Sequence, residues 1–228
     1  MILENYIKDL ENAGKLNVIG KPISKKYEIA GVLKALEPRP AIFENLTDSD
    51  YRVAGNLFCT KGQVASYFGI EKEDIIPTLS AAIDNRSPPE IVNNAPCQEV
   101  VEDKVDLNKI PILLHNKADG GPYVSSGVVV SSDPEYGQNL DFHRGMQFDK
   151  DKMVIRVVRG RDFSKFLEKR GQVDIAMCIG NTPEVLIAAA TSVETGINEL
   201  EIANALRKIR VAKAKTSNLL IPADAEFV

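Results

Sequence analysis

The 228-residue sequence has no tryptophan, only two histidines and only three cysteines. Cys59, Cys97 and Cys178 are widely separated and odd in number, which excludes a disulfide framework and a zinc ribbon. His115 and His143 each stand alone, so no histidine-based zinc site can be assembled. Isolated cysteines are typical of proteins in a reducing compartment, and we therefore expect a cytoplasmic location.

The sequence also lacks a surplus of basic residues and a long apolar run. Its formal net charge is −4, which argues against nucleic acid as a partner because phosphate neutralisation needs an excess of Lys and Arg. No apolar run approaches the roughly 18 residues of a membrane span, so we expect no membrane partner. The first residues contain acids and no basic segment followed by an apolar one, so no secretory signal is predicted.

Two kinds of hydrophobic spacing divide the chain. Helical spacing dominates the first 85 residues, and strand-like spacing begins after Gly120 and Gly121. Helices are predicted at residues 2–13, 27–36, 61–68, 72–85, 163–170, 183–190 and 199–208. Strands are predicted at 41–45, 52–58, 123–130, 139–146, 152–158, 174–179 and 213–221, and residues 90–110 are expected to be irregular. Thr60 and Thr182 are expected to cap the helices that follow them.

These elements predict an α/β (α+β) protein made of two parts. Residues 1–110 are expected to form a small mixed α/β domain, and residues 111–228 a split β-barrel-like domain. Residues 222–228 fall next to a predicted strand and lack a polar tail. We therefore expect the second domain to be cut short, with apolar core exposed at the chain end.

Two stretches near the middle of the chain are candidates for ligand binding. Residues 119–123 (DGGPY) contain two glycines, which allow positive φ and a close approach of the backbone to a ligand, or simply a tight turn. In residues 139–144 (NLDFHR), strand alternation places Asn139, Asp141 and His143 on one face. It places Arg144 on the other face, together with the apolar residues Leu140 and Phe142. A guanidinium on an apolar face is expected to meet an anion; the alternative is an Arg paired with a structural acid.

Two later stretches are compatible with an anion or metal site. Residues 156–163 (RVVRGRDF) predict either a solvated turn with Asp162 as helix cap or a basic, phosphate-facing loop whose carboxylate reaches a metal. In residues 188–207, a glycine-containing turn leads to Glu199, which opens a helix. An acid in the first turn is favourable with the helix dipole, so Glu199 has a purely structural explanation as well.

The four stretches, in this order and at similar spacing, resemble the UbiD decarboxylases. Residues 119–123 are similar to that family's DGGP-aromatic segment, and residues 139–144 to its N-x-x-x-x-R motif. The later segments 179–183 (IGNTP), 199–206 (ELEIANAL) and 222–226 (PADAE) also resemble family segments. The Phe-His-Arg version of the Asn–Arg motif looks most like the archaeal branch, which includes anhydromevalonate phosphate decarboxylase.

The resemblance implies a role for each matching residue. Asn139 and Glu199 match two ligands of a Mn²⁺ (or Mg²⁺) ion, and Asp162 stands where the family usually has a histidine as the third ligand. Oxygen ligands suit such hard ions. Arg144 matches the catalytic arginine and also contacts the flavin, while Ser125 and Phe142 match looser flavin contacts. The implied cofactors are prenylated FMN, the divalent metal and, as a further candidate, K⁺.

The implied function is non-oxidative decarboxylation of an α,β-unsaturated acid, with trans-anhydromevalonate 5-phosphate as candidate substrate. A flavin prenyltransferase would supply the cofactor, and the full-length protein is expected to be a homo-oligomer. The family's two catalytic glutamates and its C-terminal domain lie beyond residue 228, so this chain alone is expected to be inactive. The alternative is a non-catalytic flavin-binding or assembly subunit that needs a separate C-terminal chain.

Overall fold

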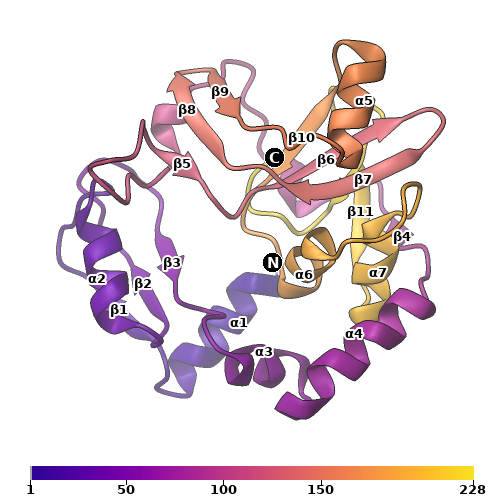
Figure 1. Ribbon diagram of the computed structural model, residues 1–228. Helices are drawn as coiled ribbons and strands as arrows, with labels where there is room; N and C mark the ends of the chain where they lie inside the picture. Colours follow the sequence, from indigo (N-terminus) through magenta and orange to yellow (C-terminus); the bar gives the residue numbers. More distant parts are fainter. Residues whose placement is uncertain (1) are drawn as a thin grey trace.

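The computed structural model describes residues 2–228, which form a mixed α/β structure (Figure 1). The first part contains α1 (Ile2–Asn12), β1 (Asn17–Ile19), α2 (Glu28–Leu36), β2 (Ala41–Phe43), β3 (Val53–Gly55), α3 (Lys61–Phe68) and α4 (Ile75–Asp84). The second contains β4 (Glu90–Ile91), β5 (Tyr123–Val124), β6 (Val128–Asp133), β7 (Gly137–Phe142), β8 (Gly145–Asp149), β9 (Lys152–Ile155), α5 (Asp162–Arg170), β10 (Ile175–Cys178), α6 (Pro183–Ala190), α7 (Glu199–Leu206), β11 (Arg210–Lys213) and β12 (Leu220–Pro222). None of the helices within residues 2–228 combines the length and hydropathy of a membrane span.

The first part is built on a small sheet in the order β1-β2-β3, with β2 parallel to β1 and antiparallel to β3. Helix α2 packs against β2, and a small core lies between them, with Ile29 and Phe43 fully buried. Helix α3 begins as expected, because Thr60 Oγ1 accepts the N–H of Gln63 and Gln63 Oε1 accepts the N–H of Thr60. This capping box satisfies donors that the first helical turn leaves free.

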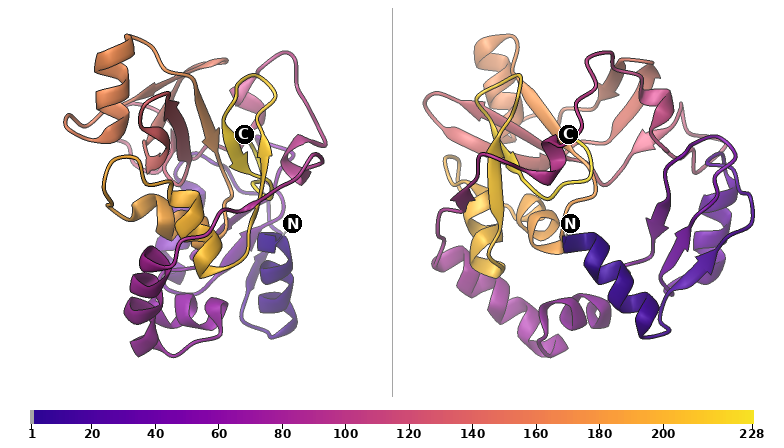
Figure 2. Two further views of the ribbon diagram at one scale, coloured as in Figure 1. Left: turned by 90° about the vertical axis from the view of Figure 1, so that its right-hand side faces the viewer. Right: turned by 180° about the vertical axis from the view of Figure 1, so that it is seen from behind.

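The second part has three more sheets, each of three strands: β10-β6-β7, β12-β11-β4 and β5-β8-β9. The largest core joins the β10-β6-β7 sheet to helices α6 and α7, with Val128, Leu140 and Ile202 fully buried or nearly so. Helix α4 contributes Ala82 to this core and lies along α7 (Figures 1 and 2). The mixed α/β class is confirmed, and the strands described here form separate sheets rather than a closed barrel. The domain boundary at residue 110 stays a prediction.

A change of register interrupts the long hairpin made by β5–β6 and β7–β8. Strand β6 pairs with β7 up to Val128 and Phe142, and pairing resumes between β5 and β8 at Val124 and Gly145. Three residues (125–127) on one arm therefore face two residues (143–144) on the other, which is the arrangement of a β-bulge. Bulges bend a strand and re-aim its side chains. The single strand predicted at 139–146 was wrong for this reason.

Other local expectations also need correction. The strand predicted at 213–221 is a hairpin of β11 and β12, closed where the N–H of Ala214 donates to the carbonyl of Leu219. Thr182 occupies the N-cap position of α6 without a side-chain hydrogen bond. Gly120 and Gly121 do not adopt positive φ. Both glycines lie against Met146, where an added side chain would be crowded. The lack of space for a side chain therefore explains these glycines better than backbone conformation does.

The chain end is largely covered up to Phe227, whereas Val228 is 51% exposed, so the expectation of exposed apolar surface holds for that residue only. Ile221, Ala223 and Ala225 are buried. Phe227 forms a bridge to Ile179 and packs edge-on against Tyr51, with the two ring centroids 5.1 Å apart. Residues of the first part therefore contribute to the packing of this segment.

Gly180 is expected to be the glycine that tolerates substitution least. It has φ +71°, and an added Cβ would overlap the side chain of Glu226. Gly171 has a similar φ of +74° with open space around it, so it is a matched control. Gly171→Ala is expected to cost about 1–2 kcal/mol of unfolding free energy from backbone strain, and Gly180→Ala about 1–3 kcal/mol more from overpacking. Urea denaturation of both variants measures the difference; equal losses would contradict the packing term.

Candidate functional site

The site begins at the exposed edge of the β10-β6-β7 sheet, because β7 has no further strand beyond it. The backbone N–H of Leu140 donates instead to Glu199 Oε2 at 2.8 Å. The carboxylate of α7 thus takes the place of a neighbouring strand and satisfies a donor that would otherwise be buried without a partner. Asn139, next to Leu140, is only 7% exposed, and its Nδ2 has no hydrogen-bond partner among the described residues.

The Glu199 carboxylate is in an environment that favours its neutral form. The side chain of Asn198 caps α7 by accepting the N–H of Leu200, which fixes the first turn and with it Glu199. Burial raises the pKa of Glu199 to about 7; the charges of Asp141 and Asp162 act in the same direction, and the N–H of Leu140 opposes them. A bound cation would offset the free-energy cost of burying the charged Glu199 carboxylate. The geometry is therefore suited to a metal ion or a proton at the two carboxylate oxygens of Glu199.

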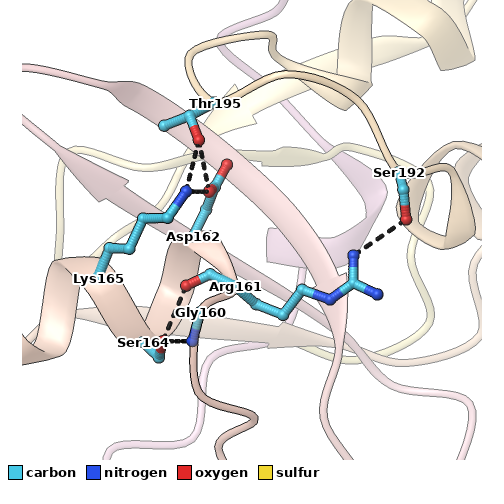
Figure 3. A network of polar contacts seen from close by, with 7 residues as sticks. All are labelled: Gly160, Arg161, Asp162, Ser164, Lys165, Ser192 and Thr195. Carbon is cyan, nitrogen blue, oxygen red and sulfur yellow. Dashed lines mark hydrogen bonds and ion pairs between the residues drawn. The ribbon is translucent and has the colours of Figure 1, made fainter.

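Asp162 lies at the start of α5, facing the loop that leads to Glu199 (Figure 3). Its Oδ1 accepts hydrogen bonds from Lys165 Nζ at 2.8 Å and Thr195 Oγ1 at 2.7 Å. Arg161 donates to Ser192 Oγ of the same loop at 3.1 Å. Asp162 is therefore close enough to affect Glu199 electrostatically, but one of its oxygens already has two partners. Its predicted role as a side-chain helix cap is not observed.

Sequence reasoning assigned no role to His143, yet this residue connects three elements of the site. It is buried, and its ring lies 4.8 Å from that of Phe163 in α5. Its Nδ1 lies 3.1 Å from the carbonyl oxygen of Arg156, which can only accept, so Nδ1 carries a proton. Its Nε2 lies 3.0 Å from Asp141 Oδ1, at ion-pair distance although the two atoms are not aligned for a hydrogen bond.

Asp141 raises the pKa of His143, and burial opposes this shift. The signal for this pair was present in the sequence, because i and i+2 residues of a strand share a face. The shared face of Asp141 and His143 is confirmed by their contact.

Arg144 lies at the bulge, where strand pairing is interrupted. The expectation that it shares an apolar face was wrong: Phe142 is 38% exposed and Arg144 is also exposed. Among residues 2–228, no carboxylate lies at ion-pair distance from its guanidinium, so the alternative of a structurally paired Arg is not observed. Its Cζ lies over the ring of Tyr123, 4.4 Å from the centroid.

Ser125 and Phe142, the other predicted flavin contacts, border the same bulge. Continuing the β5–β8 register by one pair places Ser125 opposite Arg144, and both residues are exposed. Phe142 is the last residue of β7. The structure thus gathers Ser125, Phe142 and Arg144 at one bend of the hairpin, and their roles toward a flavin stay predictions.

The oxygen-donor set Asn139, Asp162 and Glu199 suits a hard divalent cation. The buried carboxylate of Glu199 fits such a group. Asn139 would ligate through its amide oxygen, whereas the atom without a partner is its Nδ2, a donor that a cation would not satisfy. Across residues 2–228, no cluster of three His, Cys, Asp or Glu side chains is arranged for metal binding. The set contains two such side chains, Asp162 and Glu199, together with the amide of Asn139. Lys165 would have to give up its hydrogen bond to Asp162 Oδ1 before that oxygen could bind a metal.

Comparison with known families assigns the fold and chemistry to a class. The family model of the 3-octaprenyl-4-hydroxybenzoate carboxy-lyase N-terminal domain matches residues 7–83, and that of the Rift-related domain of the same carboxy-lyase matches residues 90–228. The two matches cover most of the chain. The chain belongs to the UbiD family of carboxy-lyases.

Within this family, the chain is similar to archaeal anhydromevalonate phosphate decarboxylases. It is 35% identical over 222 residues to that of Methanosarcina mazei, an alignment that covers 96% of this chain and 51% of the relative. It is 32% identical over 225 residues to that of Methanocaldococcus jannaschii, covering 96% of this chain and 52% of the relative. The chain spans about half the length of the curated relatives that it matches.

Solved structures of the family share the fold. An evolved dimeric form of HmfF from Pelotomaculum thermopropionicum, in complex with prFMN, superposes with a TM-score of 0.92 at 29% identity, covering 98% of this chain and 55% of HmfF. The closed form of vanillic acid decarboxylase from Sedimentibacter hydroxybenzoicus gives a TM-score of 0.91 at 28% identity, covering 98% of this chain and 52% of that chain.

Proposed function

We propose that this chain is the flavin- and metal-binding half of a UbiD-type decarboxylase that acts on an α,β-unsaturated carboxylic acid. The observation that carries the proposal is the arrangement along one arm of the hairpin. Asn139 and the Leu140–Glu199 contact lie on β7, and Arg144 follows at the bulge with no acid beside it. This arrangement combines oxygen donors for a cation with a free guanidinium for a carboxylate.

The names of the relatives support the choice of substrate class. The curated relatives are anhydromevalonate phosphate decarboxylases, and we take trans-anhydromevalonate 5-phosphate as the candidate substrate. The similar HmfF structure was solved in complex with prFMN, which supports prenylated FMN as the cofactor. A flavin prenyltransferase would then be needed to make it, and the assembled enzyme is expected to be a homo-oligomer.

Each candidate site residue of this chain would have a separate role. Arg144 would hold the substrate carboxylate through paired N–H donors and so fix the bond to be broken. Asn139, Asp162 and Glu199 would hold Mn²⁺ or Mg²⁺, while Ser125 and Phe142 would line the flavin. Prenylated FMN, when bound, supplies the electron sink for carbon–carbon cleavage. Protonation of the product carbon needs an acid, which we assign to a glutamate outside these 228 residues.

The experiment is to assemble a complete enzyme and assay both cofactor and product. The chain is fused after Val228 to the C-terminal half of the Methanosarcina mazei relative and co-expressed with a flavin prenyltransferase. Absorbance and mass analysis measure the bound flavin, and CO₂ release from trans-anhydromevalonate 5-phosphate measures turnover. Absence of bound flavin in a folded fusion protein would contradict the proposal.

A second candidate is a non-catalytic flavin-binding or assembly subunit. It is compatible with the absence, among residues 2–228, of a carboxylate at ion-pair distance from Arg144 that could serve as a catalytic acid. The same fusion protein discriminates between the two. Bound flavin without CO₂ release from any unsaturated acid tested would favour the binding subunit, whereas CO₂ release would exclude it.

Asp162 is expected to be a metal ligand in competition with Lys165. Asp162→Asn should weaken Mn²⁺ binding at least about tenfold, because a charged donor is lost. Lys165→Met should strengthen it, because the ammonium that neutralises Asp162 is removed. Lys169→Met, on the same helix but paired with Asp133 and Glu135, is the matched control. Titration of Mn²⁺ followed by electron paramagnetic resonance measures all three. Wild-type affinity in Asp162→Asn would leave Asp162 with a structural role only.

A further inference from the structure

The contact between Arg144 and Tyr123 has no structural explanation in the packing of the core. Both residues border the bulge, and the guanidinium carbon lies 4.4 Å from the ring centroid of Tyr123. Tyr123 belongs to the glycine-containing 119–123 segment, whose role the metal and flavin assignments leave open. The side chain of Arg144 is exposed, so the contact does not serve to bury it.

We propose that Tyr123 is a positioning residue that holds the Arg144 guanidinium at the bulge with its N–H donors free for a carboxylate. This inference rests on the proposed function, because it assigns Arg144 to the substrate carboxylate. It adds the residue that keeps this side chain in place before the substrate binds. An ordered guanidinium loses less conformational entropy when it binds a carboxylate.

The main chain that carries the Tyr123 ring is fixed by backbone contacts. The N–H of Tyr123 donates to the carbonyl of Leu113 at 3.2 Å, and Tyr123 pairs with Met146 across the β5–β8 ladder. The next residue, Val124, is buried. Tyr123 is therefore held on both sides, whereas Arg144 lies where the ladder is interrupted. Tyr123 therefore projects from paired backbone, and the arginine is the partner that needs to be ordered.

An aromatic ring is chemically better suited than an acid to this task. A carboxylate occupies the N–H donors of an arginine, as Asp224 does in this protein, where both of its oxygens accept from Arg210 Nη2 at 2.8 and 3.1 Å. The face of a ring attracts the cation without accepting an aligned N–H bond, at about 0.5–1 kcal/mol for an exposed pair. Arg144 therefore keeps both its charge and its in-plane donors.

The test uses the chain as it is, without flavin, metal or a second half. The Nε–Hε resonance of Arg144, assigned through Arg144→Lys, is followed by NMR during titration with 3-methylbut-2-enoate, an unsaturated monocarboxylate. Tyr123→Phe keeps the ring and Tyr123→Leu removes it. Tyr136→Leu, which removes the Lys169–Tyr136 cation–π contact elsewhere, controls for general loss of stability.

We expect an upfield ring-current shift of the Arg144 resonance and saturable binding in the wild type and in Tyr123→Phe. Tyr123→Leu should lose the shift and bind the probe about two- to fivefold more weakly, from the strength of an exposed cation–π contact. Should Tyr123→Leu not fold, Tyr123→Met, which resembles the neighbouring Met146, replaces it. Unchanged binding without the ring, an equal loss in Tyr136→Leu, or no probe-induced shift in the wild type would each overturn the inference.

The readout is independent of turnover. If the assembled fusion protein released no CO₂ while Arg144 still bound the probe through a ring-dependent contact, the proposed function would fail and the positioning role would stand. If the fusion protein were active while Tyr123→Leu bound the probe normally, the positioning role would fail and the proposed function would stand.

Discussion

Glu199→Gln is expected to abolish stabilisation of the protein by Mn²⁺ and to remove a pH dependence of its stability. Glutamine keeps an oxygen that can accept the Leu140 N–H but cannot carry the charge that a divalent cation needs. In the wild type, metal and proton compete for one buried carboxylate, so stabilisation by Mn²⁺ should increase as the pH rises through 7. Thermal denaturation with and without Mn²⁺, between pH 5 and pH 8, measures both effects.

The sign of the pH effect follows from the raised pKa. The Glu199 pKa is about 7 in the folded protein and 4.5 in its ordinary state. Between these values the folded state keeps a proton that the unfolded state releases. The free energy of unfolding of the metal-free protein therefore falls as the pH rises through this window, by about 3 kcal/mol in total. Glu199→Gln should lack this loss and be the more stable protein at pH 8.

Glu201→Gln is the matched control for this prediction. Glu201 lies in the same first turn of α7, but within residues 2–228 its carboxylate, unlike that of Glu199, accepts no hydrogen bond from β7. It removes the same charge from the same helix end. A similar loss of Mn²⁺ response in both variants, or a Mn²⁺ response retained in Glu199→Gln, would show that the metal is held elsewhere.

Arg144→Ala is expected to have the largest effect on activity. In the assembled fusion protein the loss of kcat/KM should reach roughly 10³-fold, because a charged donor to the reacting carboxylate is removed. Flavin content should stay near that of the wild type, since Ser125, Phe142 and the metal ligands remain. Folding should also be preserved, because Arg144 is exposed and forms no ion pair within residues 2–228.

Arg86→Ala is a suitable control for the arginine, since Arg86 is exposed after α4 and donates only to the carbonyl of Ile83 among the described contacts. Steady-state kinetics and the flavin absorbance of both variants are compared. Decarboxylation by Arg144→Ala at a near wild-type rate would remove the residue from the chemistry, and loss of flavin together with activity would reassign it to cofactor binding.

The titratable residues of the site are three acids, Asp141, Asp162 and Glu199, and two basic residues that contact them, His143 and Lys165. Asp141 and Asp162 both raise the pKa of Glu199, after the larger effect of burial. Lys165 pairs with Asp162 and so neutralises part of this negative charge, and the His143 ring lies against Asp141. A divalent ion would bind against this internal compensation. The loop carrying Thr195 is tied to Asp162 and would have to adjust when the metal binds (Figure 3).

The sequence by itself determined the element types and the class of the protein. Apolar spacing and capping residues are local signals, so α2, α3 with its Thr60 cap, and α6 were predicted close to their observed bounds. The ordered motifs from residue 119 to residue 226 were sufficient for the family, which the comparisons confirm. Strand alternation also gave the shared face of Asp141 and His143.

Only the tertiary structure decided how the site residues meet. The bulge at residues 125–127 depends on pairing between residues 14 to 21 positions apart, and no local pattern encodes it; Arg144 and Phe142 lie exposed beside it. The contact of Glu199 with the Leu140 N–H depends on β7 being a sheet edge. The Asp162–Lys165–Thr195 network depends on a loop returning over α5. These are long-range contacts, and their free energy depends on burial and charge that only the folded chain creates.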